Sequence, residues 1–201
     1  MNILYTFIVT GFLFICFCKP AFSQTDANIP LHGITIYIDY PDAPTTVSAI
    51  QLDSLINGIN YREPGVERTF RKYWYEQSRR NVVFHHDIFF YTAPLPASHY
   101  DTVGWQKGIT LWKDALEWVI TNNPAYNWDA LSRDAGGGLR SVMILSSSFA
   151  PDGVGGGHGP YWTLSNGALV SRIYGSVLKA PWDTTNNMFM TLHEGGHAVF
   201  N

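Results

Sequence analysis

The pentapeptide SVMIL, residues 141–145, decides how the rest of this chain has to be arranged. It is a short apolar run with no polar residue alternating through Val142–Leu145, a pattern typical of a strand that is buried on both faces. Such a strand needs one apolar layer above it and another below it. The stretch therefore predicts a central strand around which other strands and helices pack.

Two strands and three helices are predicted before this central strand. The strands are 34–40, where β-branched residues alternate with other residues, and 81–91, where two apolar runs flank a polar centre. The helices are 48–59, 66–79 and 110–121, in which apolar residues recur three or four positions apart.

A glycine-rich stretch, a strand and a final helix are predicted after the central strand. Residues 153–159 are interpreted as a flexible loop near a cleft, and residues 168–173 as a strand. The final helix begins near Asp183, where threonines can cap it, and runs towards the C-terminus with an apolar stripe. Because strands and helices roughly alternate, the pattern favours an α/β or α+β layer packed around one sheet.

The first 23 residues have the form of an export signal. An apolar run is followed by Ala21 and Ser23, two small residues at the spacing that a signal peptidase recognises. We therefore expect a signal peptide over 1–23 and a secreted domain, extracellular or periplasmic, over 24–201, without stable membrane insertion after cleavage. A retained anchor is the alternative. Cys16 and Cys18 both lie in the signal, so the secreted domain is expected to have no disulfide.

The composition predicts one globular domain and excludes two classes of partner. Of the 201 residues, 15% are aromatic and 14% are charged, which does not fit a disordered chain. The formal net charge is −3, and removal of Lys19 with the signal would lower it further. Neither nucleic acid nor an anionic membrane is therefore expected as a partner.

The segment TLHEGGHAVFN, residues 191–201, contains the sharpest chemical motif of the chain. On a helix, His193 and His197 share one face, so both imidazoles can bind one zinc ion. Glu194 is offset by one residue, which lets its carboxylate act as the general base on a zinc-bound water. The motif predicts His193 and His197 as metal ligands and Glu194 as the catalytic residue. Two surface histidines on an ordinary helix are the alternative.

This ending resembles the secreted bacterial metallopeptidases of the immune inhibitor A type, which belong to the zincin superfamily. Two softer patterns accompany it: the aromatic helix 70–78, and the apolar strand within 139–148 followed by the glycine-, histidine- and tryptophan-bearing segment 155–162. The likeness covers about residues 34–201. It implies an α+β fold, namely a zincin-like N-terminal subdomain in which a mixed twisted sheet packs against helices, including the HExxH helix. It also implies a zinc-dependent endopeptidase with a protein or peptide substrate.

The chain departs from that family pattern directly after the second histidine. The family usually continues with a glycine and then a third metal ligand, His or Asp, whereas Phe200 occupies the glycine position and the sequence ends at Asn201. We therefore expect 24–201 to be the N-terminal part of a catalytic domain, truncated just after the motif. Two imidazoles hold zinc more weakly than three ligands, so the fragment alone is expected to be inactive.

Several weaker signals point elsewhere. The glycine-rich stretch 153–159 lacks the spacing of a nucleotide-binding loop, although His158 within it could touch substrate. Segment 85–87, His-His-Asp, could be taken for metal ligands. Adjacent strand residues point to opposite faces and cannot both bind one ion, so it is interpreted as a polar strand segment. Asp129, Asp134 and Asp152 miss the spacing of a calcium loop.

A second function remains open from the sequence. The many aromatic residues would also suit an exported module that binds a glycan or a protein, with His193 and His197 as a vestigial pair. The tryptophans, including Trp112 and Trp118 on one predicted helix, are most simply explained as core residues.

Overall fold

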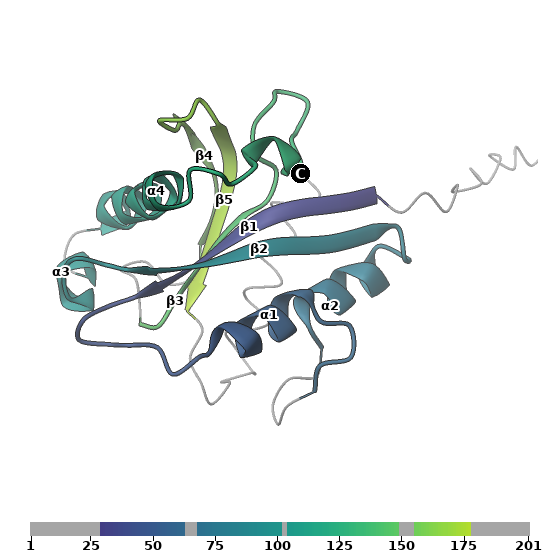
Figure 1. Cartoon of the computed structure of the whole chain (residues 1–201), viewed down its shortest axis with the longest axis horizontal. Helices are drawn as coiled ribbons and strands as arrows, with labels where there is room; N and C mark the ends of the chain where they lie inside the picture. The colour runs from purple at the N-terminus through teal and green to yellow at the C-terminus, as the bar shows by residue number, and fades with distance from the viewer. Residues whose placement is uncertain (1–28, 63–67, 102–103, 149–154, 178–201) are drawn as a thin grey trace, which may run out of the picture.

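A computed structural model describes residues 29–62, 68–101, 104–148 and 155–177 of the chain (Figure 1). In chain order, its elements are β1 (Ile29–Asp39), α1 (Ala49–Asn57), α2 (Phe70–Gln77), β2 (Val82–Thr92), α3 (Ala97–Asp101), α4 (Gly104–Asn122), the short 3-10 helix η1 (Trp128–Ala130), β3 (Val142–Ser146), β4 (Gly155–Thr163) and β5 (Leu169–Val177).

The strands form one mixed five-stranded sheet in the order β2-β1-β3-β5-β4. The pairs β1–β2, β1–β3 and β3–β5 are parallel, and β4 is antiparallel to β5. The chain is thus an α+β fold with a mixed sheet and a few helices, as expected.

Helices cover both faces of this sheet (Figure 1). On one face, Ile34, Ile36 and Ile38 of β1 share a core with Leu111 and Leu116 of α4. On the other face, Leu31 and Tyr37 of the same strand share a core with residues of α1 and α2, among them Leu52, Leu55, Phe70 and Trp74. All five residues of β3 are buried, which confirms the prediction that this strand has an apolar layer on each side.

Local signals in the sequence position the helices α1 and α2 against the sheet. Ser48 caps α1, because its side chain accepts a hydrogen bond from the Gln51 amide while the Gln51 side chain accepts from the Ser48 amide. Thr69 caps α2 in the same way, by accepting from the Lys72 amide. Two apolar residues of the helix predicted over 48–59, Ile50 and Ile59, are exposed, and Ile59 lies beyond the end of α1.

The interpretation of residues 153–159 as a flexible loop is wrong for the part that the structure describes. The backbone from Gly155 onwards forms β4, which pairs with β5 and has an irregularity between His158 and Trp162. A turn around Gly167, at φ +84°, brings the two strands together. The backbone of a glycine-rich segment can form the hydrogen bonds of a sheet when a partner strand lies beside it. The residue pattern alone does not reveal that partner.

Other predicted boundaries shift, and two predicted segments lie outside the described residues. The strand β1 begins at Ile29 and the helix α4 at Gly104, both earlier than predicted, and the short helix α3 was not predicted. The signal peptide 1–23 and the final helix from Asp183 fall outside the part of the chain that the structure describes.

The predicted core role of the helix tryptophans is confirmed. Trp112 of α4 is buried, and its ring lies against the backbone of Gly175 in β5, where any side chain would overlap it. Trp118 is partly buried and packs against the same core. The close approach of α4 to the sheet therefore depends on the absence of a Cβ atom at Gly175.

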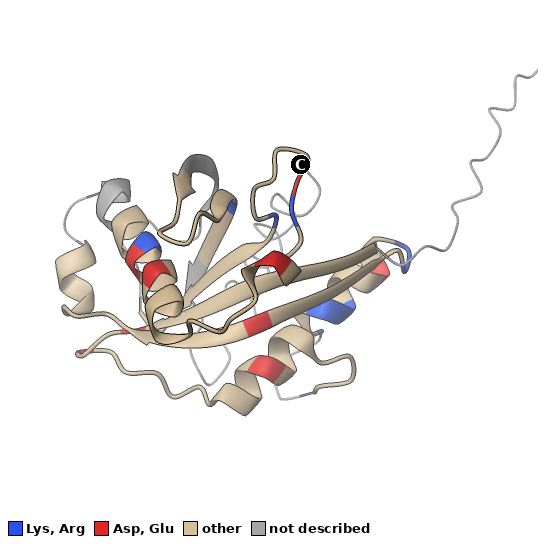
Figure 2. Ribbon diagram, turned by 45° about the horizontal axis from the view of Figure 1, so that its top comes forward, with Lys and Arg blue, Asp and Glu red and all other residues tan. Residues whose placement is uncertain are grey.

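Charge is sparse and mixed over this fold. Figure 2 shows acidic and basic residues distributed over helices, strands and loops of the described chain, with most of the ribbon carrying neither. Among the described residues, no helix combines the length and the apolar character that crossing a membrane requires.

Candidate metal centre

The three residues of the HExxH motif, His193, Glu194 and His197, lie outside the described residues. The side chain of His158 lies outside them too, although its backbone is part of β4 and pairs with Arg172 of β5. The described part of the chain nevertheless brings a different group of possible metal ligands together.

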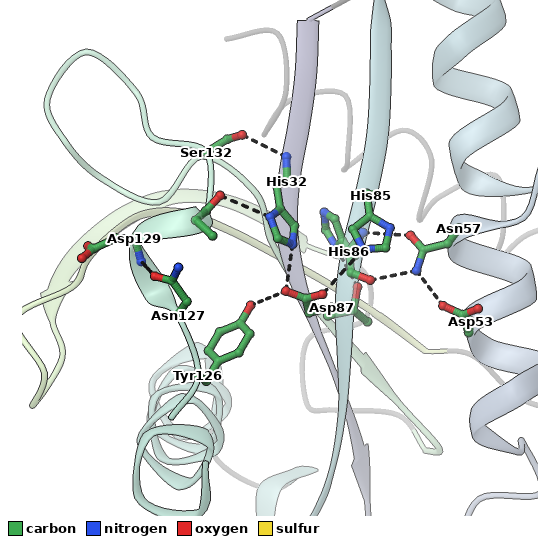
Figure 3. Close-up of polar contacts among 12 residues, drawn as sticks. His32, Asp53, Asn57, His85, His86, Asp87, Tyr126, Asn127, Asp129 and Ser132 are labelled. Carbon is green, nitrogen blue, oxygen red and sulfur yellow. Dashed lines mark hydrogen bonds and ion pairs between the residues drawn. The ribbon is translucent and has the colours of Figure 1, made fainter. Parts of the chain in front are cut away.

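This group consists of His32 on β1 and of His85 and Asp87 on β2. In the parallel pairing of the two strands, His32 is opposite His85 and Ile34 is opposite Asp87. Since side chains two apart on a strand point to the same face, His85 and Asp87 project together, next to His32. Figure 3 shows the three side chains converging beside the segment that contains Tyr126.

Asp87 links the two histidines of the group. Its Oδ2 atom lies 2.8 Å from Nε2 of His32, and its Oδ1 atom lies 3.6 Å from Nε2 of His85. The rings of His32 and His85 have centroids 5.2 Å apart. One ligand atom from each of the three residues can be chosen so that all lie within 4.8 Å of one another, and the group could therefore hold a metal ion.

The segment from Tyr126 to Ser132 supports the group from the side. Tyr126 donates a hydrogen bond of 2.7 Å from its hydroxyl to Oδ2 of Asp87, and the Ala130 carbonyl lies 3.2 Å from Nδ1 of His32. Ser132 and His32 exchange two further bonds, from the His32 amide to the Ser132 hydroxyl and from the Ser132 amide to the His32 carbonyl. The position of the His32 ring is thus fixed by backbone as well as by side-chain contacts.

The ligand group is partly open to solvent. The side chains of His32 and Asp87 are each 30% exposed and that of His85 is 52% exposed. An ion can therefore reach the three residues, and water can occupy a coordination position that they leave free.

His86 lies on the opposite face of the sheet and is not a member of the group. It is 1% exposed and stacks on Phe84, with ring centroids 4.1 Å apart. Its ring nitrogens contact two hydroxyls, Nδ1 with that of Thr35 at 2.7 Å and Nε2 with that of Ser141 at 2.9 Å. Burial lowers the pKa of His86 well below its usual value, and the neighbouring histidines act in the same direction. The ring is therefore neutral, and a neutral ring can be satisfied by two hydroxyls.

The backbone of His86 is held as firmly as its ring. The Asn57 side chain, at the end of α1, accepts a bond from the His86 amide and donates one to the His86 carbonyl, each 2.8 Å long. Asn57 also donates to Asp53, which places its amide group between α1 and β2 (Figure 3). These hydrogen bonds fix the stretch of β2 that carries His85 and Asp87.

Segment 85–87 is part of a strand, as predicted, but its alternate residues share one face of the sheet. His85 and His86 do point to opposite faces, as predicted. The pair His85 and Asp87 was missed, although a His-x-Asp spacing on a strand places both side chains on one face. The third member, His32, could be found only from the pairing of β1 with β2, which joins residues 53 positions apart in the sequence.

Two of the aspartates considered for calcium have other contacts. Asp134 accepts bonds from the amides of Gly136 and Gly138 and from the Ser171 hydroxyl. These bonds, above all that from Ser171, lower the pKa of Asp134. Asp129 forms an ion pair with Arg133. Both carboxylates brace the segment between η1 and β3, and Asp152 lies outside the described residues.

A scan of protein-family models finds no match to this chain, and a search of curated proteins finds no significant match.

Proposed function

We propose that this protein is a secreted zinc-dependent endopeptidase that hydrolyses peptide bonds in protein or peptide substrates. The observation that carries the proposal is the sequence His193-Glu194-Gly195-Gly196-His197, which combines two imidazole ligands with a carboxylate at the spacing that metal-assisted peptide hydrolysis requires. The donor set suits zinc, since neutral imidazole nitrogen is one of its preferred ligands.

Each residue of the motif has a distinct role in this proposal. His193 and His197 hold the ion from one face of a helix, and a third protein ligand completes the site. Glu194 takes a proton from the attacking water and passes it to the nitrogen of the leaving amine. The bound zinc would supply a water whose pKa is lowered to about 7 and would polarise the substrate carbonyl.

The described fold is compatible with this function and suggests how a peptide could bind. In the described part of the chain, β4 forms one edge of the sheet, with β5 as its neighbour. The backbone groups on the outer side of an edge strand can pair with an extended peptide, which positions a chain for cleavage without requiring a particular side chain. The zincin-like subdomain implied by the family resemblance also belongs to the α+β class.

The proposal is tested with the protein expressed from its complete gene. Zinc content and cleavage of a quenched fluorescent peptide library are measured for the wild-type protein, Glu194→Gln and the double variant His193→Ala/His197→Ala. Glu194→Gln should retain zinc and lose cleavage by at least about 100-fold, because the amide keeps the shape of the carboxylate but not its basicity. The double variant should lose both cleavage and the zinc bound at the motif.

Three outcomes would contradict the proposal in different ways. Loss of zinc in Glu194→Gln would make Glu194 a ligand rather than the base. Unchanged cleavage in the double variant would place the activity elsewhere. A wild-type protein that binds zinc but cleaves no peptide, while it binds a glycan or protein surface through unaltered aromatic residues, would favour a binding module.

A further inference from the structure

We infer that His32, His85 and Asp87 form a metal site of their own, which binds a divalent transition-metal ion of the zinc class and ties the strands β1 and β2 to the Tyr126–Ser132 segment. The inference rests on the described residues alone and does not depend on the proposed peptidase activity. These three residues are different from those of the HExxH motif.

The surroundings of His32 point to Nε2 as the atom that would bind a metal ion. The atom facing Nδ1 is the Ala130 carbonyl oxygen, 3.2 Å away, and a carbonyl can only accept. Nδ1 therefore carries the proton and donates a hydrogen bond to the Ala130 carbonyl. In metal sites, the non-ligating nitrogen of a histidine is usually bonded in this manner, because the bond fixes both the tautomer and the ring orientation. His32 is thus pre-oriented with Nε2 turned towards Asp87.

The Nε2 atom of His32 faces an acceptor, the carboxylate of Asp87. Nε2 of His32 lies 2.8 Å from Oδ2 of Asp87, and Tyr126 already donates to the same oxygen. Two acceptor atoms at this distance repel each other unless a positive charge lies between or beside them. A proton on Nε2 supplies that charge at the observed hydrogen-bond distance. A metal ion bound by both residues would supply it once the two atoms move apart to the spacing of two ligands. The arrangement of His85 favours the metal ion.

His85 brings a third ligand to the same place, which a simple ion pair does not require. Its Nε2 atom lies 3.6 Å from Oδ1 of Asp87, too far for a hydrogen bond but close to the spacing between two ligands of one ion. Ligands at about 2.0–2.2 Å from a tetrahedral zinc are separated from one another by about 3.3 Å. Since the His85 side chain is 52% exposed, its ring has room to close the remaining distance.

The donor atoms determine the class of ion. Two imidazole nitrogens and one carboxylate oxygen suit zinc, nickel, copper or iron, whereas calcium and magnesium take oxygen ligands. Three protein ligands leave at least one position for water. Because His32 is bonded to Ala130 and Asp87 to Tyr126, bound metal would connect two strands with the segment that follows α4. Metal binding should therefore stabilise the fold.

The test separates this site from the HExxH motif by removing the motif. In a His193→Ala/His197→Ala background, zinc binding is measured by isothermal titration and by metal content after dialysis, and cobalt(II) is used as a spectroscopic probe. This background should bind one equivalent of zinc, show the visible absorption of cobalt in a nitrogen and oxygen site, and melt at a higher temperature with zinc than with a chelator.

Further substitutions in the same background identify the ligands. Adding His32→Ala, His85→Ala or Asp87→Asn should weaken zinc binding by more than about 100-fold, as expected when one of three ligands is lost. Tyr126→Phe should weaken it by about 10-fold to 100-fold, because Tyr126 positions Asp87 without touching the ion. His99→Ala, which removes a histidine of α3 outside the group, should leave zinc binding unchanged.

The inference is overturned if the background binds no zinc, or if zinc binding persists at full strength when His32 and His85 are both replaced. If the background binds no zinc, the contact between His32 and Asp87 is an ion pair and not part of a metal site. Circular dichroism of each variant with chelator present checks that it is folded. Failure of the proposed peptidase would appear instead as unchanged cleavage in the His193→Ala/His197→Ala protein, so the two proposals can fail independently.

Discussion

His85 and His86 are neighbours in the sequence, yet their side chains lie on opposite faces of the sheet in opposite environments. The His85 side chain is 52% exposed beside Asp87, whereas His86 is 1% exposed and bonded to the hydroxyls of Thr35 and Ser141. The alternation of side chains along β2 therefore assigns a structural role to one histidine and leaves the other free to bind a ligand.

The first prediction compares these two histidines directly. His86→Leu should lower the free energy of unfolding by about 2–4 kcal/mol, because it leaves the buried hydroxyls of Thr35 and Ser141 without their partner. His85→Leu, at the adjacent exposed position, should change it by less than about 0.5 kcal/mol. Denaturant unfolding with a metal chelator present measures both values. Equal losses in the two variants would contradict the assignment of His86 as the structural histidine.

The second prediction concerns the glycine opposite His86. A Cβ atom at Gly33 would overlap the His86 ring and the Ser141 carbonyl oxygen, and the latter belongs to the backbone and cannot turn away. Gly33→Ala should therefore destabilise the protein by about 1–3 kcal/mol through overpacking.

The matched control for this glycine is Gly108→Ala. Gly108 lies within α4, and a Cβ atom there would meet no neighbouring atom. Alanine has the higher helix propensity, so this variant should be more stable than the wild type by up to about 1 kcal/mol. Thermal unfolding of both variants gives the comparison, and a stable Gly33→Ala protein would show that β1 and β2 are not packed as described.

The third prediction compares the caps of α1 and α2. Ser48 is exposed, and Ser48→Ala should cost about 1 kcal/mol, the usual loss of an N-cap. Thr69 is fully buried and also donates to the Gly58 carbonyl, which follows α1. Thr69→Ala removes a cap and leaves that carbonyl without its donor, so it should cost more than Ser48→Ala, by about 1–3 kcal/mol. The order of the two midpoints in a denaturant titration decides this prediction.

The fourth prediction is a loss of stability at alkaline pH. Burial raises the pKa of Tyr37 from 10.0 to about 12, and the carboxylate of Asp39 acts in the same direction. Burial also raises the pKa of Tyr174. A tyrosine whose pKa is higher in the folded state than in the unfolded state stabilises the folded state, and the full contribution is present at pH values below the pKa of the unfolded state. This contribution is lost as the pH rises from 10.0 towards about 12.

Tyrosinate absorbance and circular dichroism, recorded together, measure this effect. Part of the tyrosinate signal should appear only together with the loss of structure rather than near pH 10.0, the usual tyrosine pKa. Tyr37→Phe should show a shallower decrease of stability over this range, because it has one ionisable group fewer. A decline of the same slope in Tyr37→Phe would assign the alkaline instability to other groups.

Elements whose signals are local along the chain can be predicted from the residue pattern alone. The run Val142–Leu145 has no polar alternation, and it forms the fully buried strand β3. Ser48 and Gln51 sit three residues apart before an apolar stripe, and they form the capping box of α1. Such features depend on neighbours within a few positions along the chain, so residue pattern is sufficient to predict them. The HExxH motif is local in the same sense, and it carries the proposed function.

Features that depend on contacts between residues far apart in the sequence appear only in the tertiary structure. The glycine-rich segment became the strand β4 because β5 lies alongside it and supplies the hydrogen-bonding partners. The group of His32, His85 and Asp87 exists because the parallel pairing of β1 and β2 sets His32 opposite His85. Strand register is fixed by the burial of whole faces of a sheet, which is a property of the assembled fold. No spacing along the chain encodes which two strands will meet, and only the folded sheet brings these three side chains to one place.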